Sequence, residues 1–451
     1  MVQQKSLNAR EASLLALTSV EEDGSFVNLA LANVLSSHQM DPRDKRLASE
    51  ITYGVVTYRL TLDWLITQIT GRPAQKLDRP VLYVLRIGFY QLFYLDRVPA
   101  PAIVHSTVEL IKKGKKRALA PFVNGVMRGL LRKKGTIKWP DRQLDLVAYL
   151  SLHYAHPAWL VDRWLTRLGE QETERLLAAN NMRPSVTIRT NTLRTSRTEL
   201  LTQLTEEGLT VAPSEVAPDG IVLTNAGQLT GYLTYRSGLF QVQGESAMLT
   251  SRVLQPAPGT KVLDACSAPG GKTTHLAQLM NNQGDIIALD IHDHRLALVR
   301  ANAKRLGIDI IRTERLDARE LSPEHFGLFD HILLDVPCSG LGVIRRKPDV
   351  KWRREEADIM ALASIQQAMI TTAATVLKSG GTLVYSTCTN EPEETEDIIT
   401  AFLSLHPDFS LVSLTPYLPS AWQADVQTHS IQLYPHIHLV DGFFIAKLQK
   451  A

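Results

Sequence analysis

The spacing of apolar residues changes along the chain and divides it into three parts. In residues 47–66 and 81–95 apolar residues recur three and four positions apart, the spacing of a helix that buries one face. The same spacing predicts that residues 5–135 form only helices, with a break at Val98–Pro101 and a stop at Gly114. The last of these helices is expected to bury Phe122, Val123, Val126 and Leu130.

The second part predicts a small α+β module. Runs rich in Val, Ile, Leu and Thr at 186–192, 209–214 and 220–225 are typical of strands, and residues 197–208 have helical spacing. The arginines of this part either face the phosphate backbone of a nucleic acid or simply face solvent, and the pattern leaves both open for Arg183, Arg189, Arg194 and Arg197.

From about residue 240, strand-like and helix-like segments alternate, which is typical of a doubly wound, Rossmann-like α/β sheet. The chain is therefore expected to contain an all-α part at 1–138, a linker with the α+β module at 139–239, and an α/β domain at 240–451. The apolar runs expected to be strands of this domain are 261–266, 285–291, 310–316, 331–336, 382–387 and 442–448.

Charge and composition narrow the setting. Residues 1–140 carry 21 Lys and Arg against 11 Asp and Glu, which favours a polyanionic partner, although a solvated charged surface gives the same balance. No apolar run is long enough to span a bilayer, and the N-terminus lacks the apolar core of a signal peptide, so we expect a cytoplasmic protein without membrane contact. The chain has three cysteines, which form neither a disulfide framework nor a zinc-ligand spacing, so no metal is expected.

A Gly-rich loop follows the first strand of the α/β domain. A Gly pair lets the backbone approach a ligand, and the helix that follows offers free N–H groups. The loop matches neither a Walker A motif, which needs Gly at 266, nor GxGxxG. Such a loop suits a compact nucleoside such as S-adenosylmethionine, and its candidate cofactor-binding residues are Cys266, Ser267, Ala268, Pro269, Gly270, Gly271 and Lys272.

Two acidic residues follow the next two strands. Asp290 comes about twenty residues after the Gly pair, where nucleotide-binding folds place the carboxylate that binds a ribose diol. Asp317 follows the third strand and is expected to meet the adenine amino group. The alternative for both is a helix N-cap, for which Asp is a favoured residue.

The fourth and fifth strands are followed by thiols. Asp335 and Cys338 come after the fourth strand, and Cys388 comes after the fifth. A lone buried Cys is usually a small apolar residue, but two thiols at one edge of a sheet indicate covalent chemistry on a base. Lys272 is expected either to lower the pKa of a thiol, to orient Asp335, or to be a plain surface Lys.

These motifs carry a family resemblance. DACSAPGGKT, LDVPCSG, residues 343–349 with Trp352, YSTCT and DGFFIAKL resemble the Sun/Fmu family of RNA cytosine-C5 methyltransferases. LRIGFYQL, VPAPAIVHSTVELIKK and FVNGVMRGLL resemble the NusB family of helical RNA-binding domains. The three-part layout is similar to that of members acting on 16S ribosomal RNA. One departure is Gly244, where the family usually has Asp after Gln; no role is assigned to Glu245.

The resemblance implies S-adenosylmethionine-dependent methylation of a cytosine C5 in 16S ribosomal RNA by a monomer. Cys388 would attack C6 of the base, Asp335 would hold the base edge and also border the cofactor, and Cys338 would assist release. The base must leave its stack to reach the thiols. The NusB-like part and the basic run Arg345, Arg346 and Lys347 would bind the RNA.

Three rival hypotheses stay open. In a DNA cytosine methyltransferase Cys338 would be the nucleophile, although YSTCT and the NusB-like part argue against it. An RNA-binding assembly factor with an inactive methyltransferase fold is another, and the intact motifs argue against that. The third keeps the chemistry and changes the substrate to transfer RNA.

Overall fold

The computed structural model describes residues 6–224, 227, 229–425 and 429–451. They form two compact units, each with its own core. The first runs to Met182 and also contains Ile344–Arg353; we call it the helical unit. The second contains Arg183–Val343 and Arg354–Ala451; we call it the α/β unit. The predicted fold class, an all-α part, a small α+β part and a doubly wound domain, is confirmed.

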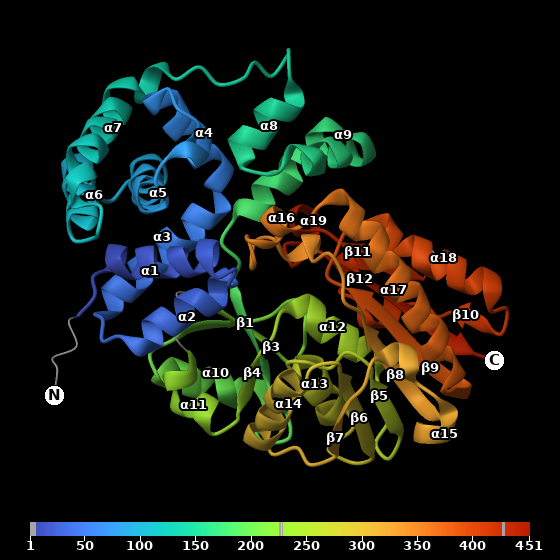
Figure 1. The fold of residues 1–451 in the computed structure, drawn as a ribbon. Coiled ribbons are helices and arrows are strands. Elements are labelled where there is room, and N and C mark those ends of the chain that lie inside the picture. Colours follow the sequence, from blue (N-terminus) through green and yellow to red (C-terminus); the bar gives the residue numbers. More distant parts are fainter. Residues whose placement is uncertain (1–5, 225–226, 228, 426–428) are drawn as a thin grey trace. The chain divides into compact units, whose positions relative to one another are not determined.

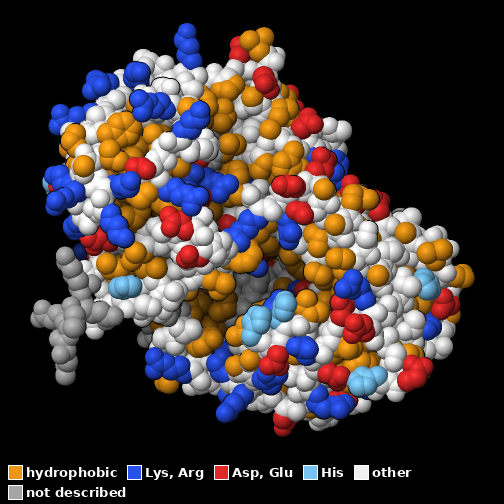
Figure 2. Space-filling model, in the orientation of Figure 1, with side chains coloured by type: hydrophobic (Ala, Val, Ile, Leu, Met, Phe, Trp, Pro, Cys, Tyr) orange, Lys and Arg blue, Asp and Glu red, His pale blue; other side chains and the backbone are white. Residues whose placement is uncertain are grey.

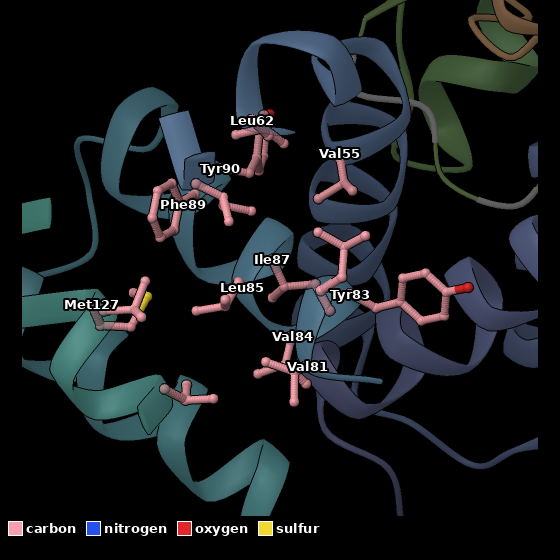
Figure 3. Close-up of a cluster of buried hydrophobic side chains, with 14 of the residues drawn as sticks. Val55, Leu62, Val81, Tyr83, Val84, Leu85, Ile87, Phe89, Tyr90 and Met127 are labelled. Atoms are coloured by element: carbon pink, nitrogen blue, oxygen red, sulfur yellow. The ribbon is translucent and has the colours of Figure 1, made fainter. Parts of the chain in front are cut away.

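The helical unit is built around one central helix, α5, whose residues from Val81 to Leu92 are all buried (Figure 1). Helices α1, α3, α4, α6 and α7 pack against it. Figure 3 shows this core, where Met127 of α7 faces side chains of α5. The helices of this unit are α1 (Ala9–Glu22), α2 (Val27–Ser37), α3 (Pro42–Thr57), α4 (Arg59–Thr70), α5 (Arg79–Tyr94), α6 (Ala100–Lys112), α7 (Ala120–Lys133), α8 (Leu146–Tyr154), α9 (Ala158–Asn181) and α16 (Val350–Arg353).

The buried face of α7 differs from the prediction at two residues, Phe122 and Met127. Val123, Met127 and Leu130 are fully buried, and they follow the helical spacing of four and three positions. Phe122 lies one position off this face and is 37% exposed, so its predicted place in the core is wrong.

Residues 344–353 contribute to the helical unit although they follow β8 in the chain. The indole Nε1 of Trp352 donates to the carbonyl of Val56 at 2.7 Å, and Arg59 lies over the indole ring. The guanidinium of Arg353 donates to the carbonyls of Gly24 and Ser25. Side-chain hydrogen bonds and apolar contact therefore bind this late segment to the first helices of the chain.

The small α+β part has four antiparallel strands in the order β2-β3-β1-β4. Its helix α10 covers one face, and Ile188, Leu204 and Phe240 belong to the core between them. The sequence pattern did not predict β4, which pairs with β1. Residue 225, at the end of the third predicted strand, lies outside the described residues. The elements are β1 (Val186–Thr190), α10 (Arg197–Glu206), β2 (Thr210–Pro213), β3 (Gly220–Thr224), α11 (Leu233–Arg236) and β4 (Phe240–Val242).

The large sheet has the order β10-β12-β9-β8-β5-β6-β7, with β11 paired to β12. Strands β9, β8, β5, β6 and β7 run parallel, and β12 is antiparallel to β9. The remaining elements are α12 (Glu245–Leu254), β5 (Lys261–Asp264), α13 (Gly271–Leu279), β6 (Asp285–Asp290), α14 (Asp293–Leu306), β7 (Ile311–Arg315), α15 (Pro323–Phe326), β8 (Phe329–Asp335), α17 (Glu356–Thr375), β9 (Leu377–Thr387), α18 (Glu396–Leu405), β10 (Phe409–Leu411), β11 (Ser430–Leu433), α19 (Pro435–His438) and β12 (Phe443–Lys450).

Helices cover both faces of this sheet, because successive residues of a strand point to opposite sides. Leu263 of β5 and Ile287 of β6 belong to the core under α17 and α18. Their neighbours Val262 and Ile286 belong to the core under α12 and α13. Such strands leave their carboxyl ends free of covering helices, and the candidate chemical groups follow these ends.

Basic residues are frequent on the face of the helical unit that Figure 2 shows, in keeping with their excess in residues 1–140. In the part of the chain that the structure describes, no helix combines the length and the apolar character needed to cross a membrane.

Candidate active site

The two thiols that follow β8 and β9 meet. These strands are parallel neighbours, so the loops after them emerge side by side. The Sγ atoms of Cys338 and Cys388 lie 3.3 Å apart, close enough for one thiol to donate to the other. The hydrogen bond between the two thiols and burial both raise the pKa of the Cys338 thiol. Cys338 is therefore protonated at neutral pH.

The third cysteine is separate from this pair. Cys266 follows β5, and its side chain packs against the apolar core under α17. Burial, together with the nearby Asp264, raises the pKa of its thiol. Burial and nearby carboxylates favour the protonated form of the Cys266 thiol, and its sulfur is not paired with the other two thiols.

The carboxylate of Asp335 lies next to the thiol loops and is held on both oxygens. The ammonium of Lys272 donates to Oδ2 at 2.8 Å, and the hydroxyl of Ser386 donates to Oδ1 at 2.8 Å. Lys272 also lies over the ring of Phe443, with 4.9 Å between Nζ and the ring centroid. Of the three possibilities for Lys272, the second, orienting Asp335, is the one that its contact with this carboxylate would allow.

The Gly-rich loop leads from β5 into α13 as expected. Gly270 has a φ of +97°, and a Cβ there would press on Val299, so this position requires glycine. A Cβ at Gly271 would meet only Gln243 at 3.9 Å. Helix α13 has no side-chain N-cap, so the N–H groups of its first turn are available to a ligand. These features fit a nucleoside cofactor bearing a carboxylate.

Within this loop, Ser267 donates from both its N–H and its hydroxyl to the carbonyl of Leu289 at the end of β6. Asn302 of α14 donates to the carbonyl of Pro269 at 2.9 Å. The loop is thus fixed to its neighbours before any ligand binds, which reduces the entropy that binding must overcome. Ala268 is half-buried between these two anchors.

The two acidic residues differ in their surroundings. Asp290 ends β6, is 6% exposed, accepts from the N–H of His292 and pairs with Arg295 at 3.1 Å. Asp317 caps a short helical turn by accepting from the N–H of Arg319, and it also pairs with the Arg319 side chain. These bonds lower the pKa of Asp317. The N-cap alternative therefore applies to Asp317, and a ligand would compete with Arg319.

Asp264 was not among the predicted residues. It ends β5, and its Oδ2 accepts from the hydroxyl of Thr273 at 2.7 Å, while Oδ1 has no hydrogen-bond partner. Burial raises the pKa of Asp264 to about 7, against an ordinary value of 3.8. Its carboxyl therefore joins the base of the loop to the first turn of α13 in a partly protonated state at neutral pH.

The raised pKa of Asp264 predicts a pH dependence of stability. Between about pH 4 and pH 7 the folded protein keeps a proton that the unfolded chain has lost, so the free energy of unfolding falls as pH rises, by roughly 4 kcal/mol over a shift of this size. Asp264→Asn removes the titrating carboxyl and with it this pH dependence of the free energy of unfolding. Urea unfolding of both proteins at about pH 5 and pH 8 should show the variant gaining relative stability at the higher pH. Asp309→Asn, on an exposed residue, should follow wild type, and parallel pH profiles for Asp264→Asn would contradict the assignment.

A buried glutamate joins the loop of Cys338 to the strand before Cys388, and no sequence motif pointed to it. Glu394 accepts from the N–H of Ser339 at 2.8 Å and from the side-chain amide of Gln366 at 2.9 Å. Its carbonyl accepts from the hydroxyl of Tyr385 near the end of β9. Burial raises the pKa of Glu394. These bonds fix the loop carrying Cys338 to the strand that precedes Cys388.

Other predicted residues lie elsewhere. Arg345, Arg346 and Lys347 belong to the segment that contributes to the helical unit, where Lys347 is exposed and the two arginines are half-buried. Gly244 is the N-cap residue of α12, and Glu245 accepts from the hydroxyl of Ser214 at 2.5 Å, a structural role. Within the described residues, no group of three or more His, Cys, Asp or Glu side chains is arranged to hold a metal ion.

Comparisons with known proteins agree with the three-part layout. The family model described as 16S rRNA methyltransferase RsmB/F matches residues 251–449. The NusB family model matches residues 7–132, and a ferredoxin-like domain of RsmF/B-like methyltransferases matches residues 156–230. The resemblance seen in the sequence motifs is therefore confirmed.

Whole-chain relatives extend this match. The probable ribosomal RNA small subunit methyltransferase B of Bacillus subtilis is 38% identical over 448 residues, covering 99% of both chains. The ribosomal RNA small subunit methyltransferase B of Klebsiella pneumoniae is 37% identical over 455 residues, again covering 99% of both. The crystal structure of NSun6 from Pyrococcus horikoshii with SFG is 28% identical, with a TM-score of 0.59 over 66% of this chain and 99% of that one. The chain belongs to the RsmB/F family of 16S rRNA methyltransferases, whose methyl donor is S-adenosylmethionine.

Proposed function

We propose that this enzyme methylates C5 of a cytosine in 16S ribosomal RNA through a covalent bond between Cys388 and C6 of the base. The observation that carries the proposal is the pair of thiols, 3.3 Å apart, in the loops beside the carboxylate of Asp335. A methyltransferase acting on a nucleophilic nitrogen or oxygen would need neither thiol. Cytosine C5 needs one, because this carbon is too weak a nucleophile unless a group first adds to C6.

Cys388 is the proposed nucleophile. Its sulfur adds to C6, and electron density then gathers at C5, the atom that accepts the methyl group. Of two thiols in hydrogen-bond contact only one readily loses its proton, because the second charge would lie next to the first. The Cys338 thiol has a raised pKa and keeps its proton, which supports Cys388 as the nucleophile of the pair.

Asp335 is the proposed base-edge residue. Addition to C6 raises the electron density at the ring N3, which takes up a proton from solvent, and a carboxylate positioned there stabilises the protonated ring. Lys272 and Ser386 hold the two oxygens of Asp335, so little reorganisation is needed when the base arrives.

Cys338 is proposed to act after methyl transfer. The C5 hydrogen must leave as a proton to solvent water, and the electrons of its bond then re-form the C5–C6 double bond as the bond from C6 to Cys388 breaks. Cys338 contacts the sulfur that departs, so it can assist this step by donating a hydrogen bond to the leaving thiolate.

For the cofactor, we propose that the loop from Cys266 to Lys272 holds S-adenosylmethionine, which supplies the methyl group when bound. Asp290 would accept from the ribose hydroxyls, and Asp317 would approach the adenine.

The helical unit, with Arg345, Arg346 and Lys347, would contact the RNA, and the affinity for RNA would then fall as the salt concentration rises. We further propose that the protein is cytoplasmic, since its substrate is ribosomal RNA, and that it is a monomer. The proposed domain limits are 1–138, 139–239 and 240–451.

Covalent trapping tests the proposal. Cys338→Ala and Cys388→Ala are each incubated with 16S ribosomal RNA and S-adenosylmethionine and then run on a denaturing gel. We expect a stable protein–RNA adduct with Cys338→Ala, because release is impaired, and none with Cys388→Ala. Nucleoside analysis of RNA treated with wild type should show 5-methylcytidine.

Three outcomes would contradict the proposal. An adduct with Cys388→Ala alone would make Cys338 the nucleophile, as in a DNA-type enzyme. Methyl transfer to 16S ribosomal RNA at another atom would overturn the C5 assignment. Absence of transfer by wild type, with transfer to transfer RNA instead, would change the substrate.

A further inference from the structure

Arg189 is a buried arginine that joins the small sheet to the cofactor loop. It lies on β1, where Ile188 points into the core under α10, so Arg189 points to the opposite face. Its side chain is 1% exposed and contacts the first two turns of α13. The prediction that Arg189 faces either RNA or solvent is therefore wrong.

The guanidinium has four acceptors. Nη1 donates to the carbonyl of Gly271 at 2.7 Å and also to Oε1 of Gln243. Nη2 donates to the hydroxyl of Thr274 at 3.0 Å, and Nε donates to Oε1 of Gln278 at 3.2 Å. Three of the four acceptors thus belong to α13, which begins at Gly271.

All four acceptors are electrically neutral. Among the described residues, Arg189 has no carboxylate within ion-pair distance, in contrast to buried Arg86 of the helical unit, which pairs with Asp63 and Glu21. Burial lowers the pKa of Arg189 to about 9; Asp219 opposes this shift and Arg305 adds to it. A buried charge without a charged partner is costly for stability, and such costs are typically retained at functional sites.

The position of this charge is unfavourable for the helix itself. The N-terminus of α13 carries the positive end of the helix dipole, so a cation beneath it repels that end. The same arrangement is favourable once an anion occupies the N-terminus, because helix dipole and guanidinium then act on it together. S-adenosylmethionine carries one anionic group, the carboxylate of its methionine portion.

We propose that Arg189 is a positioning residue for the carboxylate end of S-adenosylmethionine. It fixes the carbonyl of Gly271 from below, so that the N–H groups of the first turn of α13 point toward the ligand, and it supplies the positive charge that the carboxylate needs. The inference rests on the proposed placement of the cofactor at the loop from Cys266 to Lys272. It makes a strand of the small α+β part a support of the cofactor site.

Two ligands that differ in the amino-acid portion test this role. S-adenosylhomocysteine carries the carboxylate, and 5′-methylthioadenosine lacks it. Isothermal titration of the full chain measures both ligands against wild type, Arg189→Met, Arg189→Lys and a control, Arg197→Met, in the same small α+β part. We expect Arg189→Met to weaken S-adenosylhomocysteine by about tenfold or more and 5′-methylthioadenosine by less than about threefold.

Rescue by lysine separates charge from packing. Arg189→Lys keeps the charge and should recover part of the affinity for S-adenosylhomocysteine, and Arg197→Met should bind both ligands as wild type does. Thr274→Val removes one acceptor and leaves the charge, so a smaller loss is expected. If Arg189→Met does not fold, Arg189→Lys is the test. Its smaller loss of affinity should again be greater for S-adenosylhomocysteine than for 5′-methylthioadenosine.

Equal weakening of both ligands would overturn the inference, because Arg189 would then only support the loop. Unchanged affinity for S-adenosylhomocysteine would overturn it as well. Failure of wild type to bind S-adenosylhomocysteine would instead contradict the proposed cofactor site.

Discussion

Replacing Asp335 with asparagine is expected to lower the turnover number for methyl transfer by about 10²–10³-fold, the usual loss when one preorganised electrostatic group is removed from a transition state. Asparagine keeps the shape and one acceptor, but it cannot carry the charge that stabilises a protonated ring. Transfer of labelled methyl groups to 16S ribosomal RNA at saturating cofactor and RNA measures the loss. A lower turnover number with little change in the affinity for the RNA would place Asp335 in the chemical step.

The same strand provides the control. Asp330 lies near the start of β8, where its carboxylate pairs with Lys378 at 2.6 Å, and Asp335 lies at the end of that strand. Asp330→Asn should therefore keep turnover within about threefold of wild type, as expected for a partly exposed pair. A comparable loss in both variants would point to damage of β8. Unchanged turnover in Asp335→Asn would remove this carboxylate from the mechanism.

Replacing Trp352 with alanine is expected to destabilise the helical unit by roughly 2–4 kcal/mol, somewhat less than a fully buried Trp, because the side chain is half-buried. The variant loses apolar contact, the hydrogen bond from the indole to Val56, and the contact with Arg59. Hydrogen exchange of the full chain should show amides of α5 exchanging at least about tenfold faster.

Lys347→Ala is the matched control for Trp352, since it lies in the same segment and is exposed. Exchange in α5 should then equal that of wild type. Strands β8 and β9 belong to the other unit, and their amides should exchange alike in all three proteins. Unchanged exchange of α5 in Trp352→Ala would contradict the role of this segment in the helical unit.

Sequence patterns predicted those residues of the site that follow strand ends. Asp290, Asp335, Cys338 and Cys388 each come after a short apolar run, and a parallel sheet presents such positions at one edge. The Gly pair was recognisable for a similar reason, because the positive φ at Gly270 favours glycine over other residue types. Local rules are enough for these residues.

Residues that act through distant partners were missed. Arg189 sits in a polar strand pattern that looks like a solvent-facing position, and only α13, far along the chain, buries it. Glu394 follows β9 among other acidic residues and is distinguished from them only by its contact with the loop of Cys338. The basic run before Trp352 resembled a nucleic-acid contact, and nothing local indicates that it belongs with the first helices. Hydrophobic periodicity and short motifs carry no information on contacts between residues that are far apart in the chain.

Because residues 344–353 belong to the helical unit, this unit cannot be completed in the order in which its helices are synthesised. A ribosome releases α1 to α9 long before it reaches residues 344–353, and domains generally fold as they emerge. Here the first unit lacks part of its structure until β8 has been made, so its final stability comes late. A fragment ending at Met182 would lack this piece permanently. The helical unit is thus not a module that a gene fusion could move intact.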